Sequence, residues 1–406
     1  MNNPSNKYPP HWGLAGQTLP WGNRLYRKIK NNVFKHQTKG DLRKVLLVAH
    51  NIMMLEKMSE IVSIIEDNSS IQWFCTVVTP PDESKELIQE IKKYGYTFVH
   101  PYHASIQLWD LIMVADNHAT HNFNCTIPTL LIEHGMGDSK LISNSKERYH
   151  YARCNTLNKK NSPVYSCMFE ASERRKQEAI NDIPALEDRI SVVGHIELDS
   201  IISMNKDRLN LRHKFGYSDD DIVVFICSSH GDGSLMDSIG HELIAEALTL
   251  PQRYKFILTS HFLSWNKNKS NELSPGESLL RYESERVRVL RPESDFLTNA
   301  VLSDICVSDF TSGALYFAVL NRPVIFIPFP DGVISEKSPI WSLYSGAPRI
   351  NKVEDLHSII KDLVNIYPKE ILESCSSDLL TYPGEAKERM KSEIYRLLKF
   401  SNKVGQ

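Results

Sequence analysis

The chain has 406 residues, 41% of them hydrophobic and 24% charged, which is typical of a soluble globular protein with two or three domains. Its formal net charge of -2 argues against a nucleic-acid partner, and no apolar run reaches membrane-spanning length. The N-terminus lacks an apolar signal core and the seven cysteines form no C-x-x-C pair, so we expect a cytoplasmic protein without a zinc site.

Residues 1–40 are rich in Asn, Pro, Gly and Lys, and we interpret them as an extended N-terminal arm. After this arm, short apolar runs alternate with helical patterns, which predicts a parallel sheet covered by helices on both faces. The strands expected in the first half cover 44–50, 71–78, 97–102, 108–116, 126–132, 163–169 and 189–195, and the helices 53–66 and 83–94.

A charged helical stretch over 197–215 leads into a second alternating pattern. The strands expected there cover 221–229, 254–260, 287–290, 304–307 and 324–329, and the helices 235–250 and 314–320. We therefore predict an α/β fold with two doubly wound Rossmann-like domains, an N-terminal acceptor-side domain over 41–200 and a C-terminal nucleotide-sugar domain over 201–383. Residues 384–406 are predicted as a basic amphipathic helix that either packs on the body or contacts an anionic membrane.

The polar turn SDFTSG at 308–313 connects an expected strand to an expected helix. In such a turn the first N–H groups of the helix point outward, so Thr311, Ser312 and the N–H of Gly313 could bind an anion. The alternative is that Thr311 or Ser312 only caps the helix.

Two further loops follow expected strands of the same half, where doubly wound sheets bind their ligands. Asp232 lies between two glycines in SSHGDG and could be a nucleophile, a general base or a helix cap. His261 could donate to a phosphate, shuttle a proton or be structural. Together the three loops predict a nucleotide-sugar or phosphate cleft.

Glu133 and His134 follow an expected strand of the first half and precede glycines. His134 could serve as acid or base and Glu133 could orient it or bind a sugar hydroxyl, or the segment could be an ordinary turn. His118 and His121 lack a third ligand, so we predict no metal site. The chain also lacks GxGxxG after the first strand, GxxxxGK[ST] and GxSxG, which leaves a metal-independent transferase as the favoured class.

Four segments resemble the bacterial retaining β-Kdo glycosyltransferases of capsule and O-antigen synthesis: EHGMG at 133–137, SSHGDG at 228–233, TSHF at 259–262 and SDICVSDFTSGALYFAVLNRPVIFIPF at 303–329. The last is also similar to the phosphate-binding segment of the CDP-glycerol glycerophosphotransferases, which share the two-domain GT-B architecture. The resemblance implies a GT-B fold with a cleft between the domains, a CMP-β-Kdo donor, no cofactor and an oligosaccharide or lipid-linked glycan acceptor. It leaves open a peripheral contact with the inner face of the cytoplasmic membrane.

The same resemblance implies a double displacement with Asp232 as the nucleophile, the logic of retaining glycosidases. It places Glu133 and His134 on the acceptor side, with His134 as the base. The donor would be held by Ser229, His230, His261, Thr311, Ser312 and Gly313. His261 is followed by Phe262, whereas several CMP-sugar transferases carry His-Pro at this point.

Three other functions stay open at this stage. The first is transfer of glycerol phosphate from CDP-glycerol, and the second is a non-catalytic GT-B domain that binds saccharide. The third is an epimerase of the UDP-GlcNAc 2-epimerase type, which shares the architecture.

Overall fold

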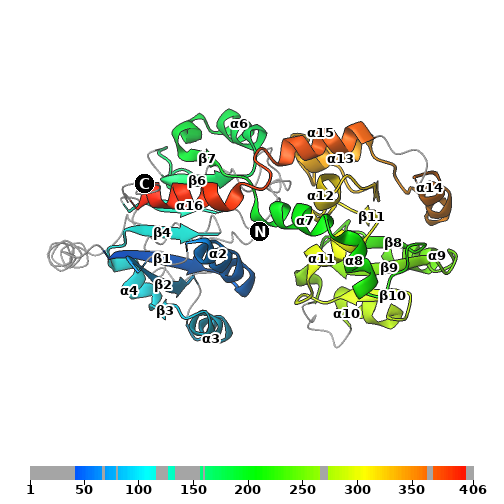
Figure 1. The fold of residues 1–406 in the computed structure, drawn as a ribbon, viewed down its shortest axis with the longest axis horizontal. Helices are drawn as coiled ribbons and strands as arrows, with labels where there is room; N and C mark the ends of the chain where they lie inside the picture. Colours follow the sequence, from blue (N-terminus) through cyan, green and yellow to red (C-terminus); the bar gives the residue numbers. More distant parts are fainter. Residues whose placement is uncertain are drawn as a thin grey trace. The chain divides into compact units, whose positions relative to one another are not determined.

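The computed structural model describes residues 42–65, 69–78, 81–115, 127–132, 156–158, 161–265, 273–363 and 369–398. The expected N-terminal arm, Glu133 and His134 lie outside these residues. The described chain forms two compact units (Figure 1), of which the second runs from His195 to Pro383. The first unit contains the residues before His195 and also the C-terminal segment from Gly384, so the last helix belongs with the beginning of the chain.

The first unit is built on a parallel sheet with strand order β3-β2-β1-β4-β5-β6-β7. The strands are β1 Arg43–Ala49, β2 Ile71–Val77, β3 Thr97–Phe98, β4 Leu111–Val114, β5 Thr129–Leu131, β6 Cys167–Glu170 and β7 Ile190–Val192. The helices are α2 Ile52–Ile64, α3 Lys85–Lys93, α4 Pro101–Ile106, α6 Glu173–Asp182, the 3₁₀ helix η3 Pro184–Arg189 and α16 Ala386–Leu397. The fully buried apolar runs of β1 and β4 explain why both faces of this sheet need a helical cover.

Helix α16 packs on the body of the first unit, one of the two arrangements expected for the basic segment. It contacts α2, and its buried side chains are Ala386, Met390 and Ile394. Glu393 accepts a hydrogen bond from the hydroxyl of Ser191 at 3.1 Å. These contacts hold the end of the chain against β7 and α2.

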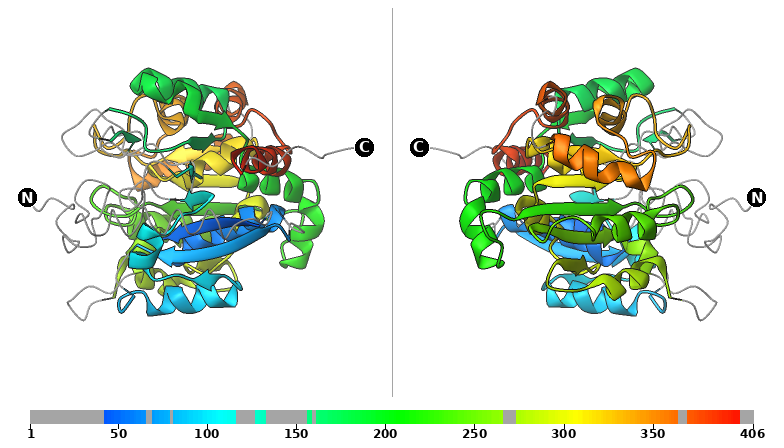
Figure 2. Two further views of the ribbon diagram at one scale, coloured as in Figure 1. Left: turned by 90° about the vertical axis from the view of Figure 1, so that its left-hand side faces the viewer. Right: turned by 90° about the vertical axis from the view of Figure 1, so that its right-hand side faces the viewer.

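The second unit has a parallel sheet with strand order β10-β9-β8-β11-β12, seen most directly in the right-hand view of Figure 2. The strands are β8 Ile222–Ser228, β9 Tyr254–Ser260, β10 Val287–Leu290, β11 Ile305–Ser308 and β12 Val324–Phe326. The α-helices are α7 Ile196–Asn205, α8 Arg208–Lys214, α9 Gly240–Ala247, α10 Pro275–Ser278, α11 Phe296–Leu302, α12 Gly313–Val319, α13 Pro339–Gly346, α14 Leu356–Leu363 and α15 Lys369–Leu379. Short 3₁₀ helices cover η4 Phe262–Trp265, η5 Leu279–Tyr282 and η6 Val353–Asp355.

The sheet divides the interior of this unit into two cores. Strand β8 contributes to both, because alternate side chains of a strand point to opposite faces of the sheet. Phe225 and Cys227 pack with residues of α11, α12, α13 and α15. Val224 and Ile226 pack with residues of α9 and α14. The chain runs from β8 to β9 in one direction and from β11 to β12 in the other, so the order reverses between β8 and β11. Such a switch point is where doubly wound sheets bind ligands.

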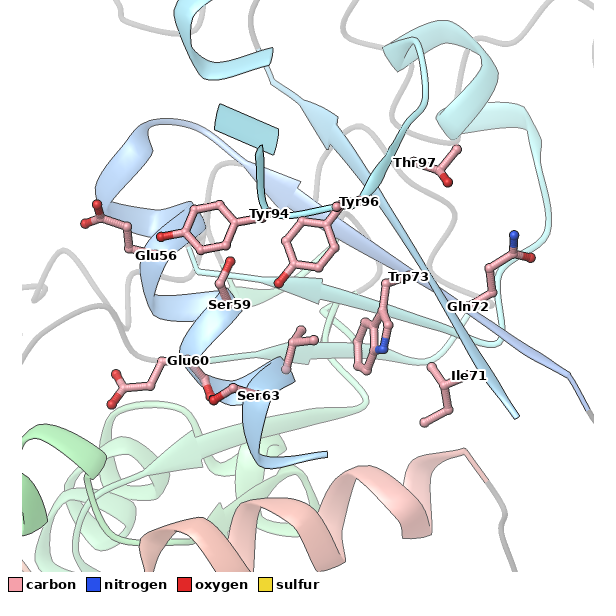
Figure 3. A pocket seen from close by; sticks show the side chains of 12 residues that line it. Glu56, Ser59, Glu60, Ser63, Ile71, Gln72, Trp73, Tyr94, Tyr96 and Thr97 are labelled. Atoms are coloured by element: carbon pink, nitrogen blue, oxygen red, sulfur yellow. The ribbon is translucent and has the colours of Figure 1, made fainter. Parts of the chain in front are cut away.

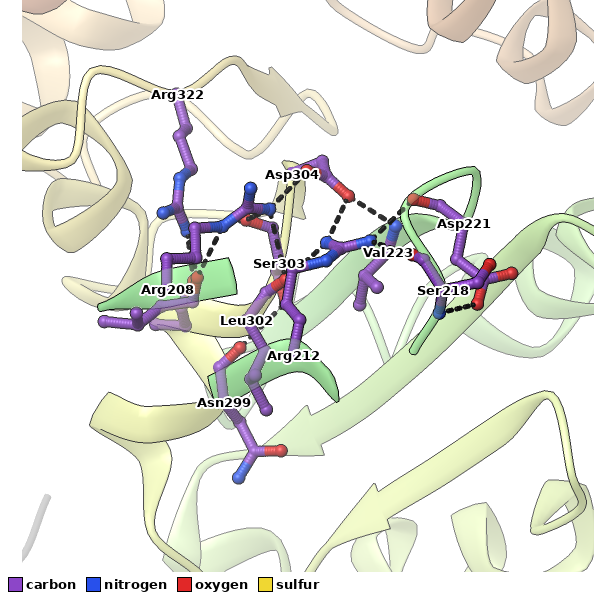
Figure 4. Close-up of polar contacts among 12 residues, drawn as sticks. Arg208, Arg212, Ser218, Asp221, Val223, Asn299, Leu302, Ser303, Asp304 and Arg322 are labelled. Carbon is purple, nitrogen blue, oxygen red and sulfur yellow. Dashed lines mark hydrogen bonds and ion pairs between the residues drawn. The ribbon is translucent and has the colours of Figure 1, made fainter. Parts of the chain in front are cut away.

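Three arginines lie at the amino-terminal end of β11, the end opposite the switch point (Figure 4). Arg208, Arg212 and Arg322 donate to backbone carbonyl groups among residues 300–303, where helix α11 ends. These cations satisfy the last carbonyls of the helix and oppose its negative end. Asp304 accepts from Arg212 at 2.9 Å and from the Val223 N–H at 2.7 Å. Burial, reinforced by the charge of Arg208, lowers the pKa of Arg322 to about 9.

Several expected elements have other bounds in the structure, and three of them differ most clearly. The strand expected over 97–102 ends at Phe98, because Pro101 begins helix α4 and His100 caps it by accepting from the Tyr102 N–H. The single helix expected over 197–215 is two helices, α7 and α8. The helix expected over 235–250 covers only Gly240–Ala247, and residues 235–239 form turns before it.

Candidate functional site

A buried carboxylate joins two of the loops at the switch point between β8 and β11. Asp309 follows β11 directly and accepts from the N–H groups of Ser229, Leu235 and Thr311 at 2.7–3.0 Å. The hydroxyls of Ser228 and Ser229 lie 3.1 and 3.2 Å from its Oδ2 atom. One side chain therefore fixes the backbone of both the β8 loop and the β11 loop.

Burial and hydrogen bonding shift the pKa of Asp309 in opposite directions. Burial raises the pKa of this carboxyl above its ordinary value, and hydrogen bonds from Leu235, Ser229, Ser228 and Thr311 act against that rise. The Ser228 hydroxyl also accepts from the Met236 N–H at 3.1 Å. These contacts hold residues 235 and 236 against the sheet edge.

Asp232 lies at the tip of a tight turn within the β8 loop. Gly231 and Gly233 have φ angles of +84° and +79°, and the Ser234 N–H donates to the Gly231 carbonyl at 3.0 Å. A Cβ atom at Gly233 would lie 2.7 Å from the ring of Pro330, so this position accepts only glycine without a shift. The Asp232 side chain is exposed, and α9 begins eight residues later. Asp232 therefore does not cap α9, the helix that it precedes.

Two imidazole rings stack beside this turn. The ring centroids of His230 and His261 are 4.1 Å apart and their planes differ by 28°. The His261 N–H donates to the Ser228 carbonyl at 2.9 Å, which links the β9 loop to the end of β8. The Leu263 N–H donates to His261 Nδ1 at 3.2 Å, so in the neutral ring the proton is on Nε2. A histidine in this tautomer can donate from Nε2 to an anion.

The β11 loop meets the same edge of the sheet. The Thr311 hydroxyl accepts from the Gly313 N–H at 3.4 Å, a long contact that caps the start of α12 only weakly. Ser312 is the residue before α12, and its side chain makes no capping hydrogen bond within the described structure. A Cβ atom at Gly313 would lie 3.2 Å from the ring of Phe296 and 3.4 Å from Cys227 Sγ, so α12 starts close against the core.

The structure thus gathers seven of the predicted site residues at one sheet edge: Ser229, His230, Asp232, His261, Thr311, Ser312 and Gly313. Sequence reasoning missed Asp309 and Ser228, which organise this edge. An Asp directly after a buried strand and before a polar turn is the signal that could have identified Asp309. Among the described residues no group of His, Cys, Asp or Glu side chains is arranged to hold a metal ion.

The family description "CDP-Glycerol:Poly(glycerophosphate) glycerophosphotransferase" matches residues 56–331. The chain belongs to this family. It is accordingly an enzyme of the glycosyl or glycerophosphate transferase kind. Membership in the glycerophosphotransferase family supports the similarity noted for residues 303–329 and favours CDP-glycerol chemistry over Kdo transfer. No curated protein sequence matches the chain.

Solved structures share the fold of this family member at low sequence identity. The wall teichoic acid polymerase TagF, as a variant soaked with CDPG, superposes with a TM-score of 0.63 and 13% identity over 94% of this chain and 99% of that chain. The UDP-GlcNAc 2-epimerase from Neisseria meningitidis, bound to UDP-GlcNAc, has a TM-score of 0.57 and 17% identity over 88% of this chain and 100% of that one. These likenesses confirm the predicted GT-B-like α/β fold. Within the described residues no helix is long and apolar enough to cross a membrane.

Proposed function

We propose that the protein transfers glycerol phosphate from CDP-glycerol to a hydroxyl group of a glycan or polyol acceptor. The observation that carries the proposal is the joining of the β8, β9 and β11 loops at the switch point by Asp309 and Ser228. Family membership supports CDP-glycerol as the donor. In sheets of this kind the nucleotide binds beyond the carboxyl ends of the strands, where these three loops meet.

The transfer needs one bond to form and one to break. The acceptor oxygen attacks the phosphorus that carries glycerol, and the bond from that phosphorus to the bridging oxygen of CMP breaks. The acceptor loses its proton, and CMP leaves as a phosphate monoester. Negative charge grows on the bridging oxygen, so the site must place hydrogen-bond donors around the two phosphates.

The described residues offer hydrogen-bond donors that can stabilise this negative charge. We assign the Nε2–H of His261 and the hydroxyls of Thr311 and Ser312 to the phosphates. Ser229 and His230 complete the site that binds CDP-glycerol. Glu133 and His134 remain the proposed acceptor-side groups, with His134 removing the acceptor proton. The loops need no cofactor for this step, because the donor already carries a good leaving group.

Asp232 favours a second candidate function, transfer of Kdo from CMP-β-Kdo. Its carboxylate is exposed at the tip of a glycine-bounded turn beside His230, as a nucleophile that attacks an anomeric carbon would need to be. A carboxylate nucleophile would form a covalent glycosyl adduct, which direct transfer of glycerol phosphate does not require.

A donor comparison on the whole purified chain tests the proposal. CDP-glycerol and CMP-β-Kdo are each incubated with the protein and a panel of glycan and polyol acceptors, and donor loss and product mass are followed. Consumption of CDP-glycerol with a product heavier by one glycerol phosphate is the expected result. Turnover of CMP-β-Kdo alone, with one Kdo added to the product, would replace the first candidate by the second.

A further inference from the structure

The first unit contains a pocket of about 750 Å³ whose lining has its own chemistry (Figure 3). Its walls come from the C-terminal half of α2, the first residues of β2 and the segment that leads into β3. It therefore opens at the amino ends of β2 and β3, whereas the candidate transfer site uses strand carboxyl ends of the other unit. This volume falls within the range of about 300–1,000 Å³ usual for small-molecule sites.

Three aromatic side chains line this pocket. The ring centroids of Tyr94 and Tyr96 are 6.0 Å apart and their planes differ by only 10°, so the two rings present parallel faces. The half-buried indole of Trp73 lies next to Tyr96 in Figure 3. Tyr94 is 45% exposed, so its ring is accessible to a ligand.

The polar groups around the rings are carboxylates, hydroxyls and the carboxamide of Gln72. Glu56 and Glu60 line one side with Ser63, and Thr97 lies at the other end of the pocket. The twelve lining residues include no Lys, Arg or His. Phosphate and nucleotide ligands would meet two carboxylates here and no cation, which makes this pocket unsuitable for the anionic donor.

We propose that this pocket binds a neutral saccharide. The apolar C–H face of a sugar ring stacks on an aromatic face, and the hydroxyls at the ring edge donate to carboxylates and exchange hydrogen bonds with side-chain hydroxyls. Tyr94, Tyr96 and Trp73 supply the stacking surface, and Glu56 and Glu60 supply strong acceptors. The volume accommodates more than one sugar ring, so an oligosaccharide fits better than a monosaccharide.

An ammonium ligand fits the same pocket less well. Aromatic cages that bind such cations surround them with several ring faces, whereas Tyr94 and Tyr96 have parallel planes and do not face a common centre. The Glu56 side chain is exposed, so water and salt screen its attraction for a cation. The number of hydroxyl-bearing side chains also suits a ligand with many hydrogen-bonding groups of its own.

Two tyrosines of the first unit provide a matched pair for the test. Tyr94 lines the pocket and is 45% exposed, and Tyr102 in α4 lies outside it and is 44% exposed. Replacing either by Ala removes a similar exposed aromatic surface, so a difference between the variants reports on the pocket rather than on folding. Glu56→Gln adds a change that keeps the size of the side chain and removes only its charge.

The probes are maltotriose and chitotriose as neutral saccharides, with tetramethylammonium and glycerol 3-phosphate as charged comparisons. Binding to the full chain is followed by saturation-transfer NMR and calorimetry. We expect millimolar or tighter binding of a saccharide, weakened about tenfold (about 1.4 kcal/mol) by Tyr94→Ala and by Glu56→Gln, and unchanged by Tyr102→Ala. Failure of both saccharides to bind, binding of tetramethylammonium in their place, or equal loss in the two tyrosine variants would overturn the proposal.

The same variants separate this inference from the proposed transfer reaction. Turnover of CDP-glycerol with a small soluble acceptor should be equal in the original chain, Tyr94→Ala and Tyr102→Ala, since none of the residues assigned to CDP-glycerol lines the pocket. A saccharide site can therefore be demonstrated even if the donor proves to be different, and a correct donor does not by itself establish the saccharide site.

Discussion

The Asp309 carboxylate accepts a hydrogen bond of 2.7 Å from the N–H of Leu235, a residue 74 positions earlier in the chain. The same carboxylate binds the N–H of Ser229, so it closes the β8 loop from both of its ends. The loop that carries His230 and Asp232 is thereby held by a side chain from another strand. The donor site is consequently expected to depend on Asp309, although this residue is buried and does not face solvent.

Replacing Asp309 by Asn should destabilise the second unit. An amide keeps one oxygen acceptor but turns an NH₂ group toward N–H donors, which leaves a buried donor without its partner. The cost of such a group is about 1–3 kcal/mol, measured as the change in the free energy of unfolding in urea. Asp237→Asn is the matched control, because that side chain is exposed in the same loop and should change stability by less than about 0.5 kcal/mol. Equal effects of the two substitutions would show that Asp309 does not organise the loop.

The stability difference between the original chain and Asp309→Asn should depend on pH. Because burial raises the pKa of Asp309 in the folded state above its ordinary value of 3.8, the folded state holds the proton more tightly than the unfolded state. The stabilisation from this group is complete below pH 3.8 and is lost as pH rises through the folded-state pKa. Urea titrations between pH 4 and neutrality should therefore show the advantage of the original chain decreasing as pH rises. An advantage that grows with pH would mean that the hydrogen bonds outweigh burial.

The alternating strands were predictable because each is a continuous apolar run, and the buried β8 and β11 match the expected segments closely. The role of Asp309 could not be predicted, because its hydrogen-bond partners lie more than seventy residues away in the sequence and no local pattern reveals them. The pocket of the first unit was also missed, because Trp73 lies in β2 and Tyr94 at the end of α3, and the pocket forms only when these elements pack together.

The two glycines that flank Asp232 should differ in their tolerance of alanine. Both have positive φ angles, which cost an L-residue about 1–2 kcal/mol. At Gly231 a Cβ atom would meet nothing within 4 Å, whereas at Gly233 it would lie 2.7 Å from Pro330. Gly233→Ala should therefore lower the free energy of unfolding by more than Gly231→Ala does, and by about 1 kcal/mol or more beyond it. A larger loss for Gly231→Ala in urea unfolding would contradict this account of the turn.

Neighbouring arginines of α6 should differ in their contribution to stability. Arg175 is 1% exposed and pairs at 3.0 Å with Glu170, which is fully buried, whereas Arg174 pairs with Glu178 near the surface. Arg175→Met removes the guanidinium that pairs with the buried Glu170 carboxylate and should cost about 3–5 kcal/mol in thermal or urea unfolding of the whole chain. Arg174→Met should cost at most about 1 kcal/mol. Similar costs for the two variants would show that the Glu170 carboxylate finds another partner.

The substitution Asp232→Asn distinguishes the two candidate reactions, because only Kdo transfer uses the Asp232 carboxylate as a nucleophile. An amide cannot attack an anomeric carbon as a carboxylate does, so a Kdo-transferring enzyme would lose turnover by orders of magnitude and would form no adduct. A glycerophosphotransferase whose acceptor attacks phosphorus directly does not need this carboxylate as a nucleophile and should retain most of its turnover of CDP-glycerol. Since Asp232 is exposed and has no hydrogen bond to the described residues, the substitution should leave the stability of the chain unchanged. Intact-protein mass spectrometry with each donor, beside the rates of donor loss, reads both outcomes. An adduct of one Kdo on the original chain that is absent in Asp232→Asn would overturn the proposed donor and establish Asp232 as the nucleophile.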